Sequence, residues 1–135
     1  MHVTGSCQCG AVRYEADVDT TAAIRVCHCT DCQRFTGSAF RVAARAIPDS
    51  LKLTAAEPRT YVKVAASGNR VEQFFCGTCG SHLYGSVPGV EPRPYTLRVG
   101  SIDQRDQLRP TMQIWTRSRL GWVEQLGALP EHETQ

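Results

Sequence analysis

The chain has 135 residues, of which 41% are apolar and 21% charged, a composition typical of a globular domain and not of a disordered segment. Its formal net charge of +2 comes without a run of lysines and arginines, which argues against a nucleic-acid partner. No segment approaches the roughly 18 apolar residues of a membrane-spanning helix, so no membrane partner is expected. This length predicts one domain over residues 1–135, with a polar tail at 130–135 that frays.

Short segments of β type follow one another along the chain. Residues 11–18 alternate in polarity, with Val12 and Tyr14 on the apolar face, which predicts a strand with one buried side. Turn residues separate the segments, and Ser67-Gly68-Asn69 predicts the clearest hairpin. Further strands are expected at residues 40–47, 51–54, 60–65, 71–75, 82–87, 95–99 and 112–116.

Helix is expected in only one short place, the turn Asp31-Cys32-Gln33-Arg34 that follows Cys29. No long amphipathic helix is expected. About eight short strands with little helix predict a mostly β fold, a small multi-stranded domain.

Seven cysteines lie in three tight clusters: Cys7-Gln8-Cys9, Cys27-His28-Cys29-Thr30-Asp31-Cys32 and Cys76-Gly77-Thr78-Cys79. An odd number cannot pair completely as disulfides, and charged residues interrupt the apolar stretch that a secretion leader would need at the start of the chain. We therefore expect a cytoplasmic protein, in which clustered cysteines serve as metal ligands or redox groups. A zinc-free thiol redox protein that uses the middle cluster is the alternative.

Two of the clusters have the spacing of a structural zinc site. Cys76-x-x-Cys79-Gly80 has the form of a zinc knuckle, because the glycine permits the left-handed turn that directs backbone N–H groups at sulfur. Cys7-x-Cys9-Gly10 offers a matching pair. Such a zinc would clamp distant parts of the chain, with an apparent binding free energy of about 10–16 kcal/mol.

The middle cluster can hold a second zinc through Cys27, Cys29 and Cys32, with one open coordination position. An added thiol could enter that position as the nucleophilic thiolate, so these cysteines are the expected catalytic centre. Spacing alone also permits another division, in which Cys7 and Cys9 share a metal with Cys27 and Cys29. A fourth protein ligand would instead close the second site, and those available are His2, His28, Asp31 and His82.

A family resemblance rests on three segments: Gly5-Ser6-Cys7-Gln8-Cys9-Gly10-Ala11-Val12, Cys27-His28-Cys29-Thr30-Asp31-Cys32-Gln33-Arg34-Phe35-Thr36-Gly37-Ser38 and Phe75-Cys76-Gly77-Thr78-Cys79-Gly80-Ser81. They resemble the glutathione-dependent formaldehyde-activating enzyme (GFA) family, which includes centromere protein V-like proteins. The resemblance extends from about Gly5 to Leu129, with later matches at Gly100-Ser101-Ile102-Asp103 and at residues 110–115.

The resemblance implies a β-tent fold and the condensation of formaldehyde with glutathione to S-hydroxymethylglutathione, a carbon–sulfur lyase reaction. By position, it also implies two sets of zinc ligands. The structural zinc would be held by Cys7, Cys9, Cys76 and Cys79, and the second zinc by Cys27, Cys29 and Cys32.

This sequence departs from the family pattern at two positions. Gln113 stands where a histidine usually precedes Ile-Trp, and Gln73 stands where an arginine usually precedes the knuckle. Losing an imidazole and a guanidinium near the metal could change which anionic substrate is held.

Thiol addition to an aldehyde needs proton transfer, and His28 and His82 are the histidines expected to supply it, ahead of Asp31. Phe40 and Trp115 are expected in the core. Glutathione carries two carboxylates, which arginines bind well. The candidate substrate-binding arginines are Arg34, Arg41 and Arg98.

The leading hypothesis is therefore a zinc-dependent, carbon–sulfur lyase-like enzyme that acts on a small thiol such as glutathione, or on its aldehyde adduct. The alternative is a non-enzymatic zinc-binding module for a protein or nucleic-acid partner. That alternative predicts a closed second zinc site and no response to thiols.

Overall fold

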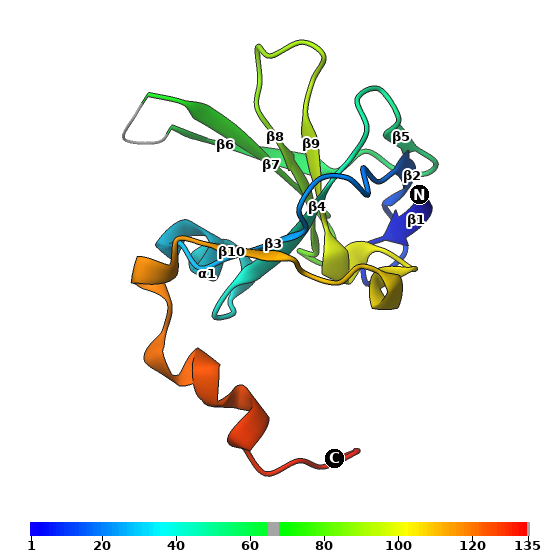
Figure 1. Cartoon of the computed structure of the whole chain (residues 1–135). Coiled ribbons are helices and arrows are strands. Elements are labelled where there is room, and N and C mark those ends of the chain that lie inside the picture. The colour runs from blue at the N-terminus through cyan, green and yellow to red at the C-terminus, as the bar shows by residue number, and fades with distance from the viewer. Residues whose placement is uncertain (65–67, 135) are drawn as a thin grey trace.

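The computed structural model describes residues 1–64 and 68–134, whose strands form the two sheets of Figure 1. The smaller sheet has the order β1-β2-β5, with β1 at His2–Ser6, β2 at Arg13–Asp17 and β5 at Lys52–Leu53. The larger sheet has the order β10-β3-β4-β9-β8-β7-β6. The strands of the larger sheet are, in chain order, β3 Arg25–Cys27, β4 Arg41–Arg45, β6 Arg59–Val64, β7 Arg70–Phe75, β8 His82–Ser86, β9 Tyr95–Arg98 and β10 Met112–Ile114.

All neighbouring strands are antiparallel except β10 and β3, which run parallel. The helical segments are short: α1 Thr30–Thr36 and the 3-10 helices η1 Val99–Ser101, η2 Arg105–Gln107, η3 Thr116–Ser118 and η4 Gly121–Ala128. The prediction of a mostly β fold with little helix is confirmed. Within the described residues, no helix is long and apolar enough to cross a membrane.

Every strand expected from the sequence overlaps an observed one, while β1 and β3 were not expected. Strand β1 is only five residues long and contains Gly5, which weakens strand propensity despite Val3 and Thr4, so its pairing with β2 depends on tertiary contact. The strands β6 and β7 pair with Val64 opposite Arg70, as the two arms of a hairpin do. Ser67 of the expected hairpin turn, and the end of the expected strand 60–65, lie outside the described residues.

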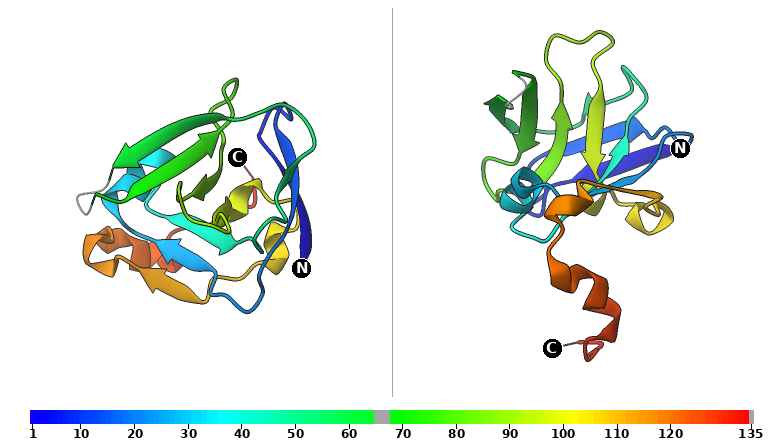
Figure 2. Two further views of the ribbon diagram at one scale, coloured as in Figure 1. Left: turned by 90° about the horizontal axis from the view of Figure 1, so that it is seen from above. Right: turned by 60° about the vertical axis from the view of Figure 1, so that its left-hand side comes forward.

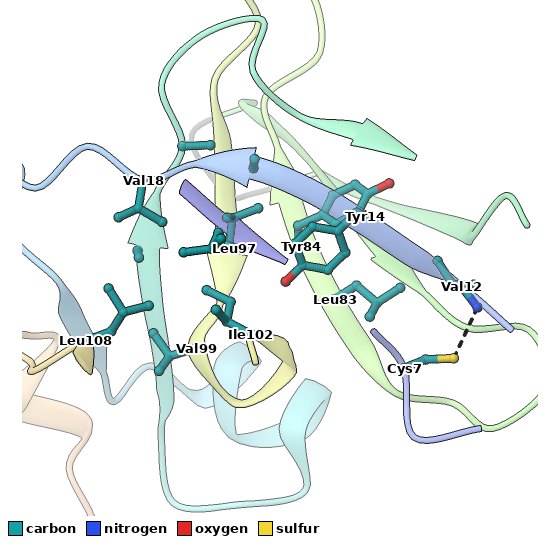
Figure 3. Close-up of a cluster of buried hydrophobic side chains, with 14 of the residues drawn as sticks. Cys7, Val12, Tyr14, Val18, Leu83, Tyr84, Leu97, Val99, Ile102 and Leu108 are labelled. Carbon is teal, nitrogen blue, oxygen red and sulfur yellow. Dashed lines mark hydrogen bonds between the residues drawn. The ribbon is translucent and has the colours of Figure 1, made fainter. Parts of the chain in front are cut away.

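The core lies between the inner faces of the two sheets, where alternate residues of β1 and β2 point inward. Figure 3 shows Tyr14 from the smaller sheet close to Leu83, Tyr84 and Leu97 of the larger one. The rings of Tyr14 and Tyr84 meet edge to face, with their centroids 5.9 Å apart. The same figure places Cys7 at the edge of this core, so one cysteine cluster is fixed directly by core packing.

Gly5 is required by the close approach of β1 to the core. A Cβ at this position would lie 2.4 Å from Cζ of Tyr14 and 2.6 Å from the carbonyl oxygen of Ser101. We therefore expect Gly5→Ala to lower the free energy of unfolding by about 1–3 kcal/mol, the usual cost of overpacking. Urea denaturation would measure this change.

The matched control for that experiment is Gly127→Ala, because a Cβ at Gly127 meets no atom within 4 Å. Equal stability of the Gly5→Ala protein and the control would contradict the packing described here.

The chain beyond β10 forms an arm, η3 and η4, that leaves the sheets (Figures 1 and 2). The expectation of a buried Trp115 was wrong: its side chain is 51% exposed, its backbone is left-handed with φ 58°, and Arg117 lies over its ring at 4.9 Å. The ring is therefore outside the core, and Trp115 instead lines a cavity beside Cys27, Cys29 and Cys32. Phe40 is half-buried. Residues 130–134 are exposed and without regular structure, in keeping with the polar tail that was expected.

Candidate metal centres and adjoining cavity

Four sulfur atoms from distant parts of the chain meet at one point. The ligand atoms of Cys7, Cys9, Cys76 and Cys79 all lie within 4.8 Å of one another. The Sγ atoms of Cys7 and Cys9 are 3.5 Å apart, and those of Cys9 and Cys76 are 3.8 Å apart. Sulfurs in a tetrahedron with a metal–sulfur distance of about 2.3 Å lie about 3.8 Å apart, so this cluster fits a zinc ion.

Backbone and hydroxyl donors surround these sulfurs. The amide of Val12 donates to Cys7 Sγ at 3.3 Å, and the amide of Thr78 donates to Cys76 Sγ at 3.4 Å. The hydroxyl and backbone N–H of Ser81 lower the pKa of Cys79 to about 5. Such donors stabilise the negative charge of a metal–thiolate centre. They arise from the turns expected after each cysteine pair, since Gly10 and Gly80 have φ near 75°.

A second cluster contains the sulfurs of Cys27, Cys29 and Cys32, again within 4.8 Å of one another. Cys27 ends β3, and Cys29 is the N-cap of α1, where its Sγ accepts a hydrogen bond from the amide of Cys32 at 3.4 Å. The strand end and the first helical turn therefore bring the three sulfurs together. A separate hydrogen bond, from the side chain of Cys32, lowers the pKa of Cys27 to about 4, and the positive charge of Arg41 lowers it as well.

The division into four and three cysteines matches the one expected from spacing, and the alternative division of Cys7 and Cys9 with Cys27 and Cys29 is wrong. Among the described residues, no histidine or carboxylate joins the three-cysteine cluster. Asp31 forms an ion pair with Lys63, and His2 lies against Asp17 at 3.2 Å. The residues that might have closed the second centre are thus engaged elsewhere or outside the cluster.

A cavity of about 190 Å³ adjoins the three sulfurs. Arg41, Arg98 and His82 line it together with the three cysteines. The same three residues and Phe35 also line a larger, outer cavity of about 460 Å³, which reaches Cys79 of the four-cysteine cluster and the neighbouring Ser81. The two cavities are therefore neighbours that share a charged wall.

A hydrogen-bond chain fixes the ring of His82 in this wall. Arg98 Nη2 donates to Gln73 Oε1 at 2.6 Å, which identifies that atom as the oxygen, because a guanidinium can only donate. His82 Nε2 lies 2.8 Å from the same oxygen and must donate to it. His82 Nδ1 is then the unprotonated nitrogen, and it is buried without a hydrogen-bond partner. Burial, together with Arg98 and Arg41, lowers the pKa of His82 to about 3, so the ring is neutral at neutral pH.

His28 and Arg34, two other residues singled out from the sequence, are not brought into either cavity. His28 is fully buried, and its Nε2 lies 2.8 Å from Oε1 of Gln113. Arg34 is exposed on α1. The departures from the family pattern therefore have distinct positions: Gln73 contacts His82 and Arg98 in the cavity wall, while Gln113 contacts a buried histidine.

A β-rich fold that holds one cluster of four cysteines and one of three, beside a cavity with two arginines, defines a small protein with two possible metal centres. The chain matches the model of the glutathione-dependent formaldehyde-activating enzyme family over residues 2–118 and belongs to that family. Its fold is similar to the crystal structure of a Rhodobacter sphaeroides protein. That likeness has a TM-score of 0.61 and 24% sequence identity, and covers 82% of this chain and 98% of the other.

Proposed function

We propose that this protein is a zinc-dependent carbon–sulfur lyase of the S-(hydroxymethyl)glutathione synthase type, which joins a small thiol to an aldehyde or cleaves the adduct. One observation carries the proposal: a three-cysteine cluster, which no histidine or carboxylate joins in the part of the chain that the structure describes, adjoins a cavity lined by two arginines and a neutral histidine. Membership of the formaldehyde-activating family supports the same chemistry.

In this proposal the two clusters have different roles. The four-cysteine cluster holds a structural zinc through Cys7, Cys9, Cys76 and Cys79. The three-cysteine cluster holds the second zinc, which when bound supplies a position where a thiol is stabilised as its thiolate. A cytoplasmic location, where thiols stay reduced, would suit both centres.

The reaction needs positioning and proton transfer but no redox partner. A carbon–sulfur bond forms between the thiol sulfur and the carbonyl carbon, the thiol loses its proton, and the carbonyl oxygen gains one. The neutral ring of His82, whose Nε2 donates to Gln73, is proposed to hold Gln73 and Arg98 in place in the cavity wall; its pKa of about 3 and its buried Nδ1 give it no role as the base. Arg41 and Arg98 line the same cavity, where their positive charge favours an anionic thiol ligand.

NMR tests the function. It follows the rate at which glutathione and formaldehyde combine to S-hydroxymethylglutathione, and the rate at which this adduct separates again. Protein loaded with two equivalents of Zn²⁺ should accelerate the exchange in both directions, and metal-free protein should not. If the loaded protein leaves the exchange rate unchanged and no thiol gives heat on titration, the enzyme proposal is wrong and the non-enzymatic zinc module is favoured.

His82 gives a further prediction for the same assay. We expect His82→Gln to lower kcat by about tenfold, because it removes a hydrogen bond that positions Gln73 beside Arg98 in the cavity wall. His132→Gln in the exposed tail is the matched control and should behave as the unaltered chain. An unchanged kcat for the His82→Gln protein would remove this residue from the mechanism.

A further inference from the structure

We propose that the 190 Å³ cavity selects thiols that carry a carboxylate a short carbon chain away from the sulfur, with Arg41 binding the carboxylate and Arg98 adding charge. This inference rests on the proposed function, since it takes the thiol to enter at the open face of the three cysteines. It names the substrate class as short mercapto acids, of which 3-mercaptopropionate is the simplest probe.

Arg41 and Arg98 have positive charge that no carboxylate among residues 1–64 and 68–134 neutralises. Among the described residues neither forms an ion pair, and the Nε atom of each is buried without a hydrogen-bond partner. Arg98 is only 5% exposed, so bulk water cannot solvate it well. Nη1 of Arg98 already donates to Thr96 and its Nη2 to Gln73, so a ligand carboxylate would take its hydrogen bonds mainly from Arg41, with Arg98 adding charge.

Neighbouring negative groups do not remove this excess of positive charge. Asp31, a carboxylate on the cavity wall, pairs with Lys63 on the same wall. Three thiolates with one Zn²⁺ carry a single net negative charge, against the two positive charges of Arg41 and Arg98. His82 is neutral and adds none. The cavity therefore keeps one positive charge, which the thiolate of a bound thiol would balance, and the carboxylate would be held by charged hydrogen bonds from Arg41.

The size of the cavity limits how far the carboxylate can lie from the sulfur. A volume of about 190 Å³ corresponds to about six water molecules at ~30 Å³ each. It is below the roughly 300 Å³ at which ligand pockets usually begin. A two- or three-carbon chain can join sulfur and carboxylate within this space. In glutathione the sulfur is flanked by amides and both carboxylates lie at the ends of the molecule, so at least part of it would extend into the outer cavity.

Isothermal titration of the Zn²⁺-loaded protein with 3-mercaptopropionate and with its methyl ester tests the inference. The two ligands present the same sulfur and chain and differ in charge. We expect the acid to bind at least about tenfold more tightly than the ester, the effect of one charged hydrogen bond. Arg41→Gln should abolish most of this preference, and it is a safer variant than one at the more buried Arg98.

Arg25→Gln is the matched control, because it removes the same charge from an exposed position on β3 that lines neither cavity. It should keep the full preference for the acid. If acid and ester bind equally, or if Arg41→Gln weakens both alike, the arginines only balance the sulfur charge and the inference is overturned while the proposed function stands. If neither thiol binds, the inference fails, and the proposed function fails with it only if glutathione also gives no heat.

Discussion

Replacing Cys79 by serine is expected to leave the protein with one zinc per chain and to unfold most of it at 37 °C. The Cys79 thiol is exposed, so the change removes a ligand without emptying a packed site. The lost metal joins the turn after β1 to the turn after β7, which are far apart in sequence. A structural zinc contributes about 10–16 kcal/mol apparent, against a total of about 5–15 kcal/mol for a typical domain.

Thermal unfolding followed by circular dichroism, with metal content measured on the same samples, checks this prediction. Thr78→Ser is the matched control, because it changes an exposed residue between the two knuckle cysteines and keeps every ligand. A Cys79→Ser protein that melts with the control, or that retains both metals, would show that this cluster does not stabilise the fold through a metal.

Replacing Cys32 by alanine should have the opposite pattern: a folded protein with one zinc and no measurable exchange activity. Cys32 lies in the short helix α1. It belongs neither to a strand of the two sheets nor to the four-cysteine cluster, so the fold should persist without its thiol. Loss of an outer partner of a metal ligand already costs about 10–100-fold in activity, so loss of a ligand should cost more. Activity and far-ultraviolet circular dichroism of the purified variant measure the two effects.

Thr30→Ala, at an exposed position in the same helix, is the control for damage to α1 alone. If the Cys32→Ala protein loses both metals and its fold, the second centre is structural as well. If it keeps full activity, the reaction does not take place at the three-cysteine cluster.

The strands that could be predicted are those whose pattern is local. The alternation around Val12 and Tyr14 follows from one face packing on the core, and the observed β2 has that burial. Strand β1 could not be predicted in this way, because Gly5 weakens its propensity and is present only to let Tyr14 and Ser101 approach. The prediction that Trp115 lies in the core was wrong because a left-handed backbone at that residue turns its ring away from the core.

The cysteine groups were predictable because short spacings bring sulfurs together in turns and helix starts. The cavity was not, since its wall depends on strand register. Arg41 faces the centre because β4 pairs with β3 so that Arg41 lies opposite Cys27. Arg98, Gln73 and His82 come from three different strands of one sheet. Gln73 was noted only as a departure from a pattern, and its contact with Arg98 and His82 needed the fold.

The most direct test is a crystal structure of the Zn²⁺-loaded protein soaked with 3-mercaptopropionate, using anomalous scattering at the zinc edge. The account predicts two zinc peaks: one enclosed by Cys7, Cys9, Cys76 and Cys79, and one bound by Cys27, Cys29 and Cys32 with the sulfur of the added thiol as its fourth neighbour. A single peak, or a protein atom completing the second site in the presence of the thiol, would contradict it.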